Sequence, residues 1–308
     1  MSEIIDHNSP DFFCSLQSRS FDESTLGTAP SAKVWFMLEY SGRWGTKAFE
    51  ESSLSDKLKA PVNAQLDNIE NARLLLIKQN SDRPSGIAFF AALADSNPSQ
   101  LYRFELSSYN DMLNIDLVAL ANADSRYDEN LVSAPIFLVC TNGLRDKCCS
   151  RNGVPAFQGL SEEFGEIVWQ STHHGGHRFS ANMLAMPYGL SYGRMDLGES
   201  TDTVEALLRN EMPLVNLRGR TSYAKVDQAA EGLLRSQFGA TDPNSLRLVS
   251  SLAQSDEIWN VIFDNIDEGI QYSVDIQRKE SETLAYVSCI GDKQAPVVEY
   301  TLLEHSAI

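Results

Sequence analysis

Residues 134–177 restrict the possible folds of this chain more than any other stretch. Residues 134–140 (APIFLVC) and 166–171 (EIVWQS) have the composition of buried strands. Between them, residues 155–164 begin with proline and are followed by glycine, the usual signals for the start and end of a helix. The distance along the chain is sufficient for a crossover between parallel strands. We therefore predict an α/β unit here.

The flanking regions predict two further segments around this unit. Before it we expect a helix and several short apolar strands, at 60–71 and at 33–40, 74–78, 86–92 and 101–106. After it we expect two helices and then only strands, at 203–210 and 223–238 and at 246–252, 258–263, 271–277, 284–289 and 297–303. The fold class is α/β (α+β) with a β-rich C-terminal extension. The predicted segments are 1–128, 129–239 and 240–308.

The charge balance excludes some classes of partner. The 308 residues include 42 acidic and 25 basic side chains, for a net charge of −17. Such a chain repels phosphate backbones and anionic lipid, so we expect no nucleic acid and no membrane as partner. The start of the chain, MSEIIDHNSPDFF, lacks the features of a signal peptide. We expect a cytoplasmic protein, in which cysteines stay reduced and serve as ligands, nucleophiles or core thiols.

Cysteines and histidines gather in the central unit. Three of the five cysteines and three of the five histidines fall there, at Cys140, Cys148, Cys149, His173, His174 and His177. The cysteines stand at a strand end and just before a helix, whose N-terminus favours thiolate. The histidines follow the next strand, so both groups are expected at the same edge of the sheet.

Two thiolates and two imidazoles on two loops form the donor set of a metal site, and Gly175 and Gly176 allow the second loop to bend. Compact zinc sites usually have two to four residues between cysteines, whereas eight separate Cys140 from Cys149. An iron–sulfur cluster tolerates wider spacing and accepts histidine ligands. A Rieske site is excluded, because its loops each carry one cysteine and one histidine. The pattern favours iron–sulfur and leaves zinc as the alternative.

These residues resemble the sucrase/ferredoxin-like family. The resemblance extends over about residues 12–235, with weaker matches near Cys14 and at 39–45. It is carried by Cys140-x8-Cys149 with Arg145-Asp146 inside it, His173-x-Gly-Gly-His177-Arg178-Phe179, Pro187-Tyr188-Gly189 and Tyr192-Gly193-Arg194. The resemblance implies a thioredoxin-like 2Fe-2S ferredoxin domain at 129–239, preceded by the family's N-terminal α/β domain. It also implies the cluster ligands, Cys140, Cys149, His173 and His177.

Other residues near these motifs receive supporting roles. Arg145, Asp146 and Arg178 are candidates to donate to the cluster or to hold its loops. Cys148 is the alternative to Cys149 as the cluster ligand and is otherwise a spare thiol beside the cluster, and His174 is expected to face solvent or a partner. We expect the two remaining cysteines, Cys14 and Cys289, to be core thiols with no ligand groups around them.

The resemblance implies an electron-transfer protein or oxidoreductase that carries single electrons. Its expected partners are a reductase and an electron acceptor, including small redox-active compounds. Glycosidase activity, which the sucrase label suggests, is not expected, because pairs of acids are common on helix and turn surfaces. The alternatives are a Cys2His2 zinc protein with a structural or interaction role, and a thiol oxidoreductase that uses Cys148 and Cys149.

Overall fold

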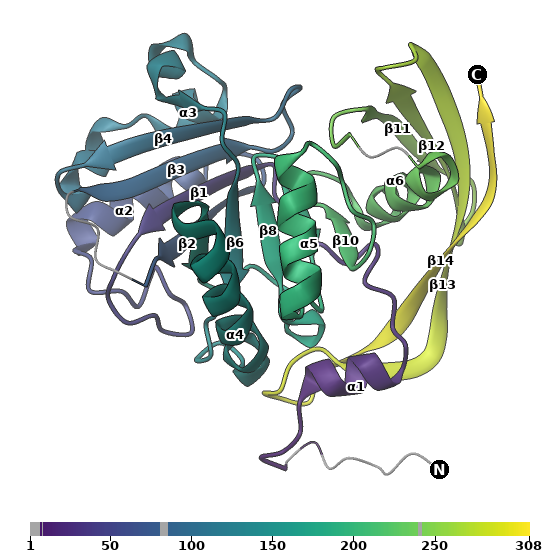
Figure 1. Cartoon of the computed structure of the whole chain (residues 1–308), viewed down its shortest axis with the longest axis horizontal. Coiled ribbons are helices and arrows are strands. Elements are labelled where there is room, and N and C mark those ends of the chain that lie inside the picture. The colour runs from purple at the N-terminus through teal and green to yellow at the C-terminus, as the bar shows by residue number, and fades with distance from the viewer. Residues whose placement is uncertain (1–6, 8, 81–85, 240–241) are drawn as a thin grey trace.

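The structure is a computed structural model, and it describes residues 7, 9–80, 86–239 and 242–308. Within these residues the strands form one sheet of ten and a separate antiparallel sheet of four (Figure 1). Helices lie against both sheets. The predicted α+β class with a β-rich C-terminus is confirmed. Residue 240, where the third segment was predicted to begin, lies outside the described residues.

The N-terminal half supplies one side of the large sheet. Strand β1 pairs with β2 in parallel and with β3 antiparallel. Their apolar side chains pack against the helices of this half in a core around Phe36, Phe89 and Leu58. The elements are α1 (Cys14–Ser20), β1 (Val34–Glu39), α2 (Asp56–Leu66), β2 (Ala72–Lys78), β3 (Ile87–Leu93), β4 (Gln100–Leu106), α3 (Leu117–Ala121) and β5 (Leu131–Val132), with 3-10 turns η1 (Tyr109–Asn114) and η2 (Ser125–Asn130).

The central region supplies the other side of the same sheet. Strands β6 and β7 are parallel and α4 connects them, as the predicted crossover requires. Strand β8 runs antiparallel to β6, and β9 to β8. The elements are β6 (Ile136–Cys140), α4 (Lys147–Phe164), η3 (Gly165–Ile167), β7 (Val168–Ser171), η4 (His177–Phe179), β8 (Met183–Met186), β9 (Leu190–Tyr192), α5 (Leu197–Leu208), β10 (Leu217–Arg220) and α6 (Lys225–Phe238).

The two regions share one continuous sheet. Its order is β10-β9-β8-β6-β7-β2-β1-β3-β4-β5, and antiparallel pairing of β2 with β7 joins the halves. The division at residues 128 and 129 stays a prediction, and hydrogen bonds of the sheet connect the strands on either side of it. This junction brings the β2 side of the N-terminal half next to the loop that follows β7.

The C-terminal sheet packs on α6 and ends in a long hairpin. Its strands are β11 (Leu246–Ala253), β12 (Ile258–Asn265), β13 (Ile270–Tyr286) and β14 (Gln294–Ala307). The predicted break between strands at 271–277 and 284–289 is wrong, because β13 runs without interruption from the first range into the second and ends at Tyr286. Figure 1 shows the far end of the β13–β14 hairpin extending to α1. No helix within the described residues has the length and hydrophobicity to cross a membrane.

Helix α4 begins eight residues before the predicted start. The Asp146 side chain caps it by accepting a hydrogen bond from the Cys148 backbone N–H at 2.9 Å. Pro155 lies inside the helix rather than in its first turn. The earlier start places the adjacent residues Cys148 and Cys149 in the first turn of α4, where their side chains point in different directions.

Candidate metal centre

The two cysteine and histidine loops meet at one sheet edge, as predicted. Cys140 is the last residue of β6 and Ser171 the last of β7, and the two are paired across the parallel strands. The chain after β6 turns into α4, and the chain after β7 forms the histidine loop. Parallel strands therefore deliver both loops to the same end of the sheet.

Four donor side chains lie in contact there. The Cys149 Sγ is 3.6 Å from the His173 Nδ1 and 3.7 Å from the His177 Nδ1. The Cys140 Sγ is 3.7 Å from the His173 Nδ1. The two imidazole rings stack with centroids 3.8 Å apart and planes 12° from parallel. Both thiols are buried, and both imidazoles are partly exposed.

The imidazoles are in the form that binds metal. Burial lowers the pKa of His173 to about 4, and burial also lowers the pKa of His177. Both rings are therefore neutral at neutral pH. A hydrogen bond from the Cys149 thiol holds the pKa of Cys140 well below its usual value, which favours one thiolate in the pair. The chemistry of this set fits zinc or an iron–sulfur cluster.

The distances bear on the size of the group that fits. With bonds of about 2.3 Å to sulfur and about 2.1 Å to nitrogen, two donors on one tetrahedral ion are about 3.6 Å apart. The observed 3.6 and 3.7 Å match this spacing. A two-iron cluster is larger than one ion, so holding it requires the side chains to rotate outward. The loop with Gly175 and Gly176, both at positive φ, offers the backbone freedom for that movement.

Three polar side chains that the sequence analysis missed hold the histidine loop. The carbonyl oxygens of the loop accept hydrogen bonds in succession: His174 from Arg73 at 2.8 Å, Gly175 from Arg218 at 2.9 Å and Gly176 from Asn182 at 2.9 Å. The sequence indicated a need for such donors only through the glycine-containing loop, because the carbonyls of a buried turn need hydrogen-bond donors. Arg73 and Arg218 are too far away in sequence to be assigned to it.

Arg218 also explains why residue 176 is glycine. The guanidinium is buried, and burial lowers its pKa to about 9. A Cβ on Gly176, whose φ is +78°, would lie 2.2 Å from the Arg218 Nη2. Any side chain at position 176 would therefore push away the group that orients the loop.

The three predicted supporting residues, Arg145, Asp146 and Arg178, have different surroundings and different roles in the structure. Asp146 is buried and caps α4 rather than contacting the four donors. Arg178 forms an ion pair with the buried Glu23, which ties the histidine loop to the N-terminal segment. Arg145 is exposed and lines a cavity that also reaches His173.

Two predictions about neighbouring residues are wrong. His174 does not face solvent: its side chain is fully buried, and burial lowers its pKa. Cys14 lies in a small hydrophobic core with Phe12, as predicted, but it and Cys289 do have ligand groups around them, because they meet Cys148 and Asp146 in a second cluster. The chain segments that form this cluster are far apart in sequence, so spacing gave no indication of it. The Cys148 thiol belongs to that cluster, and the Cys149 thiol lies with the histidines.

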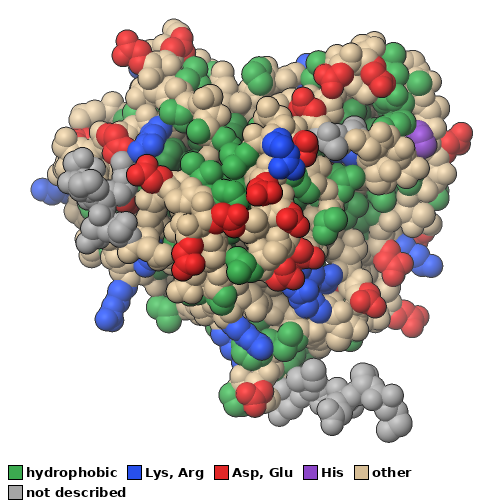
Figure 2. Space-filling view, viewed as in Figure 1, with side chains coloured by type: hydrophobic (Ala, Val, Ile, Leu, Met, Phe, Trp, Pro, Cys, Tyr) green, Lys and Arg blue, Asp and Glu red, His purple; other side chains and the backbone are tan. Residues whose placement is uncertain are grey.

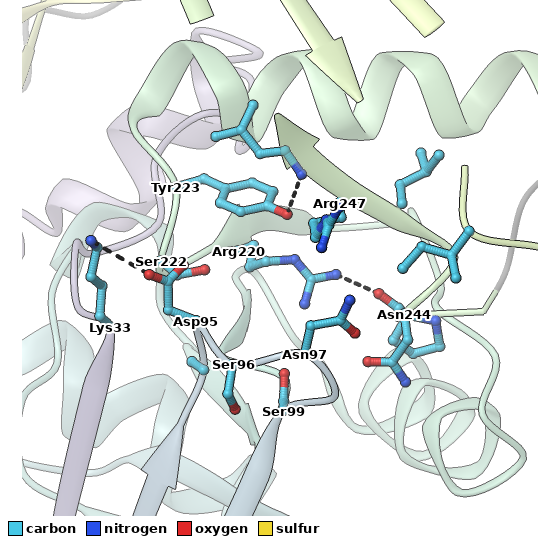
Figure 3. Close-up of a pocket in the computed structure, with 15 residues that line it drawn as sticks. Lys33, Asp95, Ser96, Asn97, Ser99, Arg220, Ser222, Tyr223, Asn244 and Arg247 are labelled. Atoms are coloured by element: carbon cyan, nitrogen blue, oxygen red, sulfur yellow. Dashed lines mark hydrogen bonds and ion pairs between the residues drawn. The ribbon is translucent and has the colours of Figure 1, made fainter. Parts of the chain in front are cut away.

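A cavity of about 370 Å³ lies beside His173. Basic side chains predominate among its charged groups, with Lys47, Arg73 and Arg145 against Glu50. Another cavity, between the large sheet and the C-terminal sheet, has charged groups that are already paired (Figure 3). There Lys33 pairs with Asp95, and Arg220 binds Glu231 and two carbonyls, those of Tyr188 and Pro243. Of these two cavities, the one at His173 borders the donor set.

Comparison with known proteins identifies the family. No curated protein and no solved structure matches the chain. The sequence model of the sucrase/ferredoxin-like family matches residues 25–219, more than half of the chain, and this range includes all four donors. The match agrees with the motifs around the two loops. The chain therefore belongs to the sucrase/ferredoxin-like family.

Proposed function

We propose that this protein is a 2Fe-2S protein that carries single electrons, with Cys140, Cys149, His173 and His177 as ligands. The observation that carries the proposal is the convergence of two thiols and two neutral imidazoles at one sheet edge, in a chain of this family. A bound cluster supplies one-electron oxidation and reduction.

The protein side chains divide the site into a buried and an accessible side. Cys140 and Cys149 are 1% and 0% exposed, so water does not reach the thiolates. His173 and His177 are partly exposed and turn Nδ1 toward the thiols, which leaves each Nε2 to hold a proton. Added negative charge at the site raises the affinity of Nε2 for its proton. The histidine edge is therefore where electron and proton uptake are coupled.

The surroundings suggest where partners bind. The cavity beside His173, with its excess of basic groups, suits a small anionic or polar electron acceptor. A reductase is the proposed donor, and the chain's charge of −17 favours one with a basic docking face. Figure 2 shows acidic side chains over the part of the surface where α4 and α5 lie. The proposed location is the cytoplasm, which keeps thiols reduced.

The test is the metal and sulfide content of protein purified without oxygen. We expect two irons and two sulfides per chain, a red-brown colour and, after reduction, the paramagnetic signal of one unpaired electron. The reduction potential should lie above the value near −400 mV of all-cysteine plant-type ferredoxins and should fall as pH rises. His177→Cys should lower the potential and weaken its pH dependence. Potentials that stay near −400 mV at every pH would contradict histidine ligation.

Zinc is the second candidate, and the donor distances favour it. The donor atoms of Cys140, Cys149 and His173 lie within 4.8 Å of one another, and their separations of 3.6 and 3.7 Å fit ligands of one tetrahedral ion. His177 contacts Cys149 but does not belong to this group, so its side chain must move to complete a four-ligand set. A colourless protein with zinc that is lost in Cys140→Ser would support a structural or interaction role. The third alternative, a thiol oxidoreductase, is disfavoured because Cys148 and Cys149 are both fully buried and point into different clusters.

A further inference from the structure

Three cysteines from distant parts of the chain form a second cluster. Cys14 begins α1, Cys148 lies in the first turn of α4, and Cys289 lies in the connection between β13 and β14. Their sulfurs are 3.2 Å apart for Cys148 and Cys289, 3.5 Å for Cys14 and Cys289, and 3.6 Å for Cys14 and Cys148. The three free thiols thus form a nearly equilateral triangle.

The triangle has the size of one face of a tetrahedral metal site. With zinc–sulfur bonds of about 2.3 Å, two thiolates on one ion are about 3.8 Å apart. The observed edges are about 0.2 to 0.6 Å shorter than that, so a bound ion requires the three sulfurs to move apart only slightly. A disulfide needs about 2.05 Å between two sulfurs and leaves the third thiol without a role. The equal spacing therefore favours a shared ion over a bridge.

A buried carboxylate stands at the fourth position. Asp146 is 0% exposed, and one of its oxygens lies within 4.8 Å of all three sulfurs. Its Oδ2 accepts hydrogen bonds from the Ser288 hydroxyl at 2.8 Å and the Cys289 N–H at 2.7 Å, which occupy both lone pairs. Its Oδ1 accepts one, from the Cys148 N–H, and keeps a second lone pair free for a ligand bond.

Backbone N–H groups are arranged to offset negative charge in this cluster. The Cys14 N–H donates to the Cys289 sulfur at 3.3 Å. The N-terminus of α4, an 18-residue helix, lies at Cys148 and places its positive end there. Both Cys14 and Cys148 are 0% exposed. The buried Asp146 carboxylate, and each thiolate that forms when an ion binds, need compensation, and a divalent cation supplies what the N–H groups do not.

We propose that this cluster binds one structural zinc ion through three thiolates and a carboxylate, those of Cys14, Cys148, Cys289 and Asp146. The ion joins α1, the start of α4 and the β13–β14 hairpin, which Figure 1 shows meeting below the large sheet. A carboxylate with thiolates in a closed tetrahedral set is a zinc donor set rather than a copper(I) one. The site shares no ligand with the histidine centre, so the inference does not rest on the proposed function.

The test compares the metals in three full-length proteins purified without oxygen: the unaltered chain, Cys289→Ser and the matched variant Cys140→Ser. We expect Cys289→Ser to lose one zinc per chain and keep its iron. Cys140→Ser should lose its iron and keep that zinc. Cys289→His replaces the thiolate by an imidazole, which is also a zinc ligand, so this variant should retain zinc. The comparison separates loss of a ligand from loss of folding.

The possible outcomes are distinct. Equal zinc in the unaltered chain and in Cys289→Ser overturns the inference, as does copper in place of zinc. A mass lower by two hydrogens, with a Cys148–Cys289 bridge in the nonreduced digest, shows a disulfide and overturns it as well. If the histidine centre holds zinc instead of iron, the unaltered chain contains two zincs and each serine variant one. That result contradicts the proposed function and supports this site.

Discussion

Gly153 tests whether the packing of α4 against β6 sets the geometry of the histidine centre. A Cβ at this position would lie 2.0 Å from the Cys140 carbonyl oxygen, a backbone atom at the end of β6. Ordinary contact begins at 3.4 Å. In Gly153→Ala the helix and strand must therefore separate by 3.4 − 2.0 = 1.4 Å, which also separates Cys149 from Cys140.

This displacement is large on the scale of metal coordination. Metal–ligand distances are defined to about 0.2 Å, so a separation of 1.4 Å is expected to remove most of the metal from the centre. Overpacking costs about 1–3 kcal/mol, and alanine returns about 1 kcal/mol through its higher helix propensity. The free energy of unfolding should fall by up to about 2 kcal/mol.

Gly159→Ala is the matched control in the same helix. Its Cβ would meet the end of the Leu197 side chain, which is 53% exposed and free to turn away. We expect Gly159→Ala to keep its metal and to be as stable as the unaltered protein or more so. The assay is metal per chain by elemental analysis together with the thermal unfolding midpoint. Full metal content and an unchanged midpoint in Gly153→Ala would refute the packing argument.

Three further predictions concern the loop, protonation and docking. Arg218→Met removes the donor to the Gly175 carbonyl and should weaken metal binding 10–100-fold in a chelator competition. If the chelator concentration that removes half of the metal is unchanged, the loop does not need Arg218 to keep its conformation. In metal-free protein, His173 has a lowered pKa of about 4, so the unfolded state takes up the proton before the folded state as the pH falls from 6.5 to about 4. Urea unfolding should show the free energy of unfolding falling over this pH range by up to about 1.4 kcal/mol per pH unit, and less steeply in His173→Gln. Electron transfer with a basic reductase should slow as salt rises, and a rate independent of salt would contradict electrostatic docking.

The sequence predicted the elements whose signals are local. The strands ending at Cys140 and Ser171 and the crossover between them follow from apolar runs and helix signals, and they bring the two loops together. The predicted start of α4 at Pro155 is wrong, because this proline lies inside the helix rather than in its first turn. Asp146, a good N-cap, stood just before the two cysteines, and its capping bond decides where the helix begins.

Features that depend on distant segments were beyond local reasoning. Two of the three donors to the histidine loop, Arg73 and Arg218, come from β2 and β10, on opposite sides of it in the sheet order. The expectation that His174 faces solvent treated the loop as a surface turn. In the structure the N-terminal half covers one side of it, and His174 is buried with its carbonyl bonded to Arg73.

The adjacent cysteines show how one helical turn serves two centres. Successive residues in a helix point about 100° apart, so Cys148 and Cys149 are not expected to bind the same ion. Cys149 meets donors from within the 140–177 unit, and these come together when β6 and β7 pair. Cys148 meets thiols near the two ends of the chain, at positions 14 and 289, which arrive only when α1 and the hairpin dock. The first centre belongs to the central unit, whereas the second depends on the whole chain having folded around it.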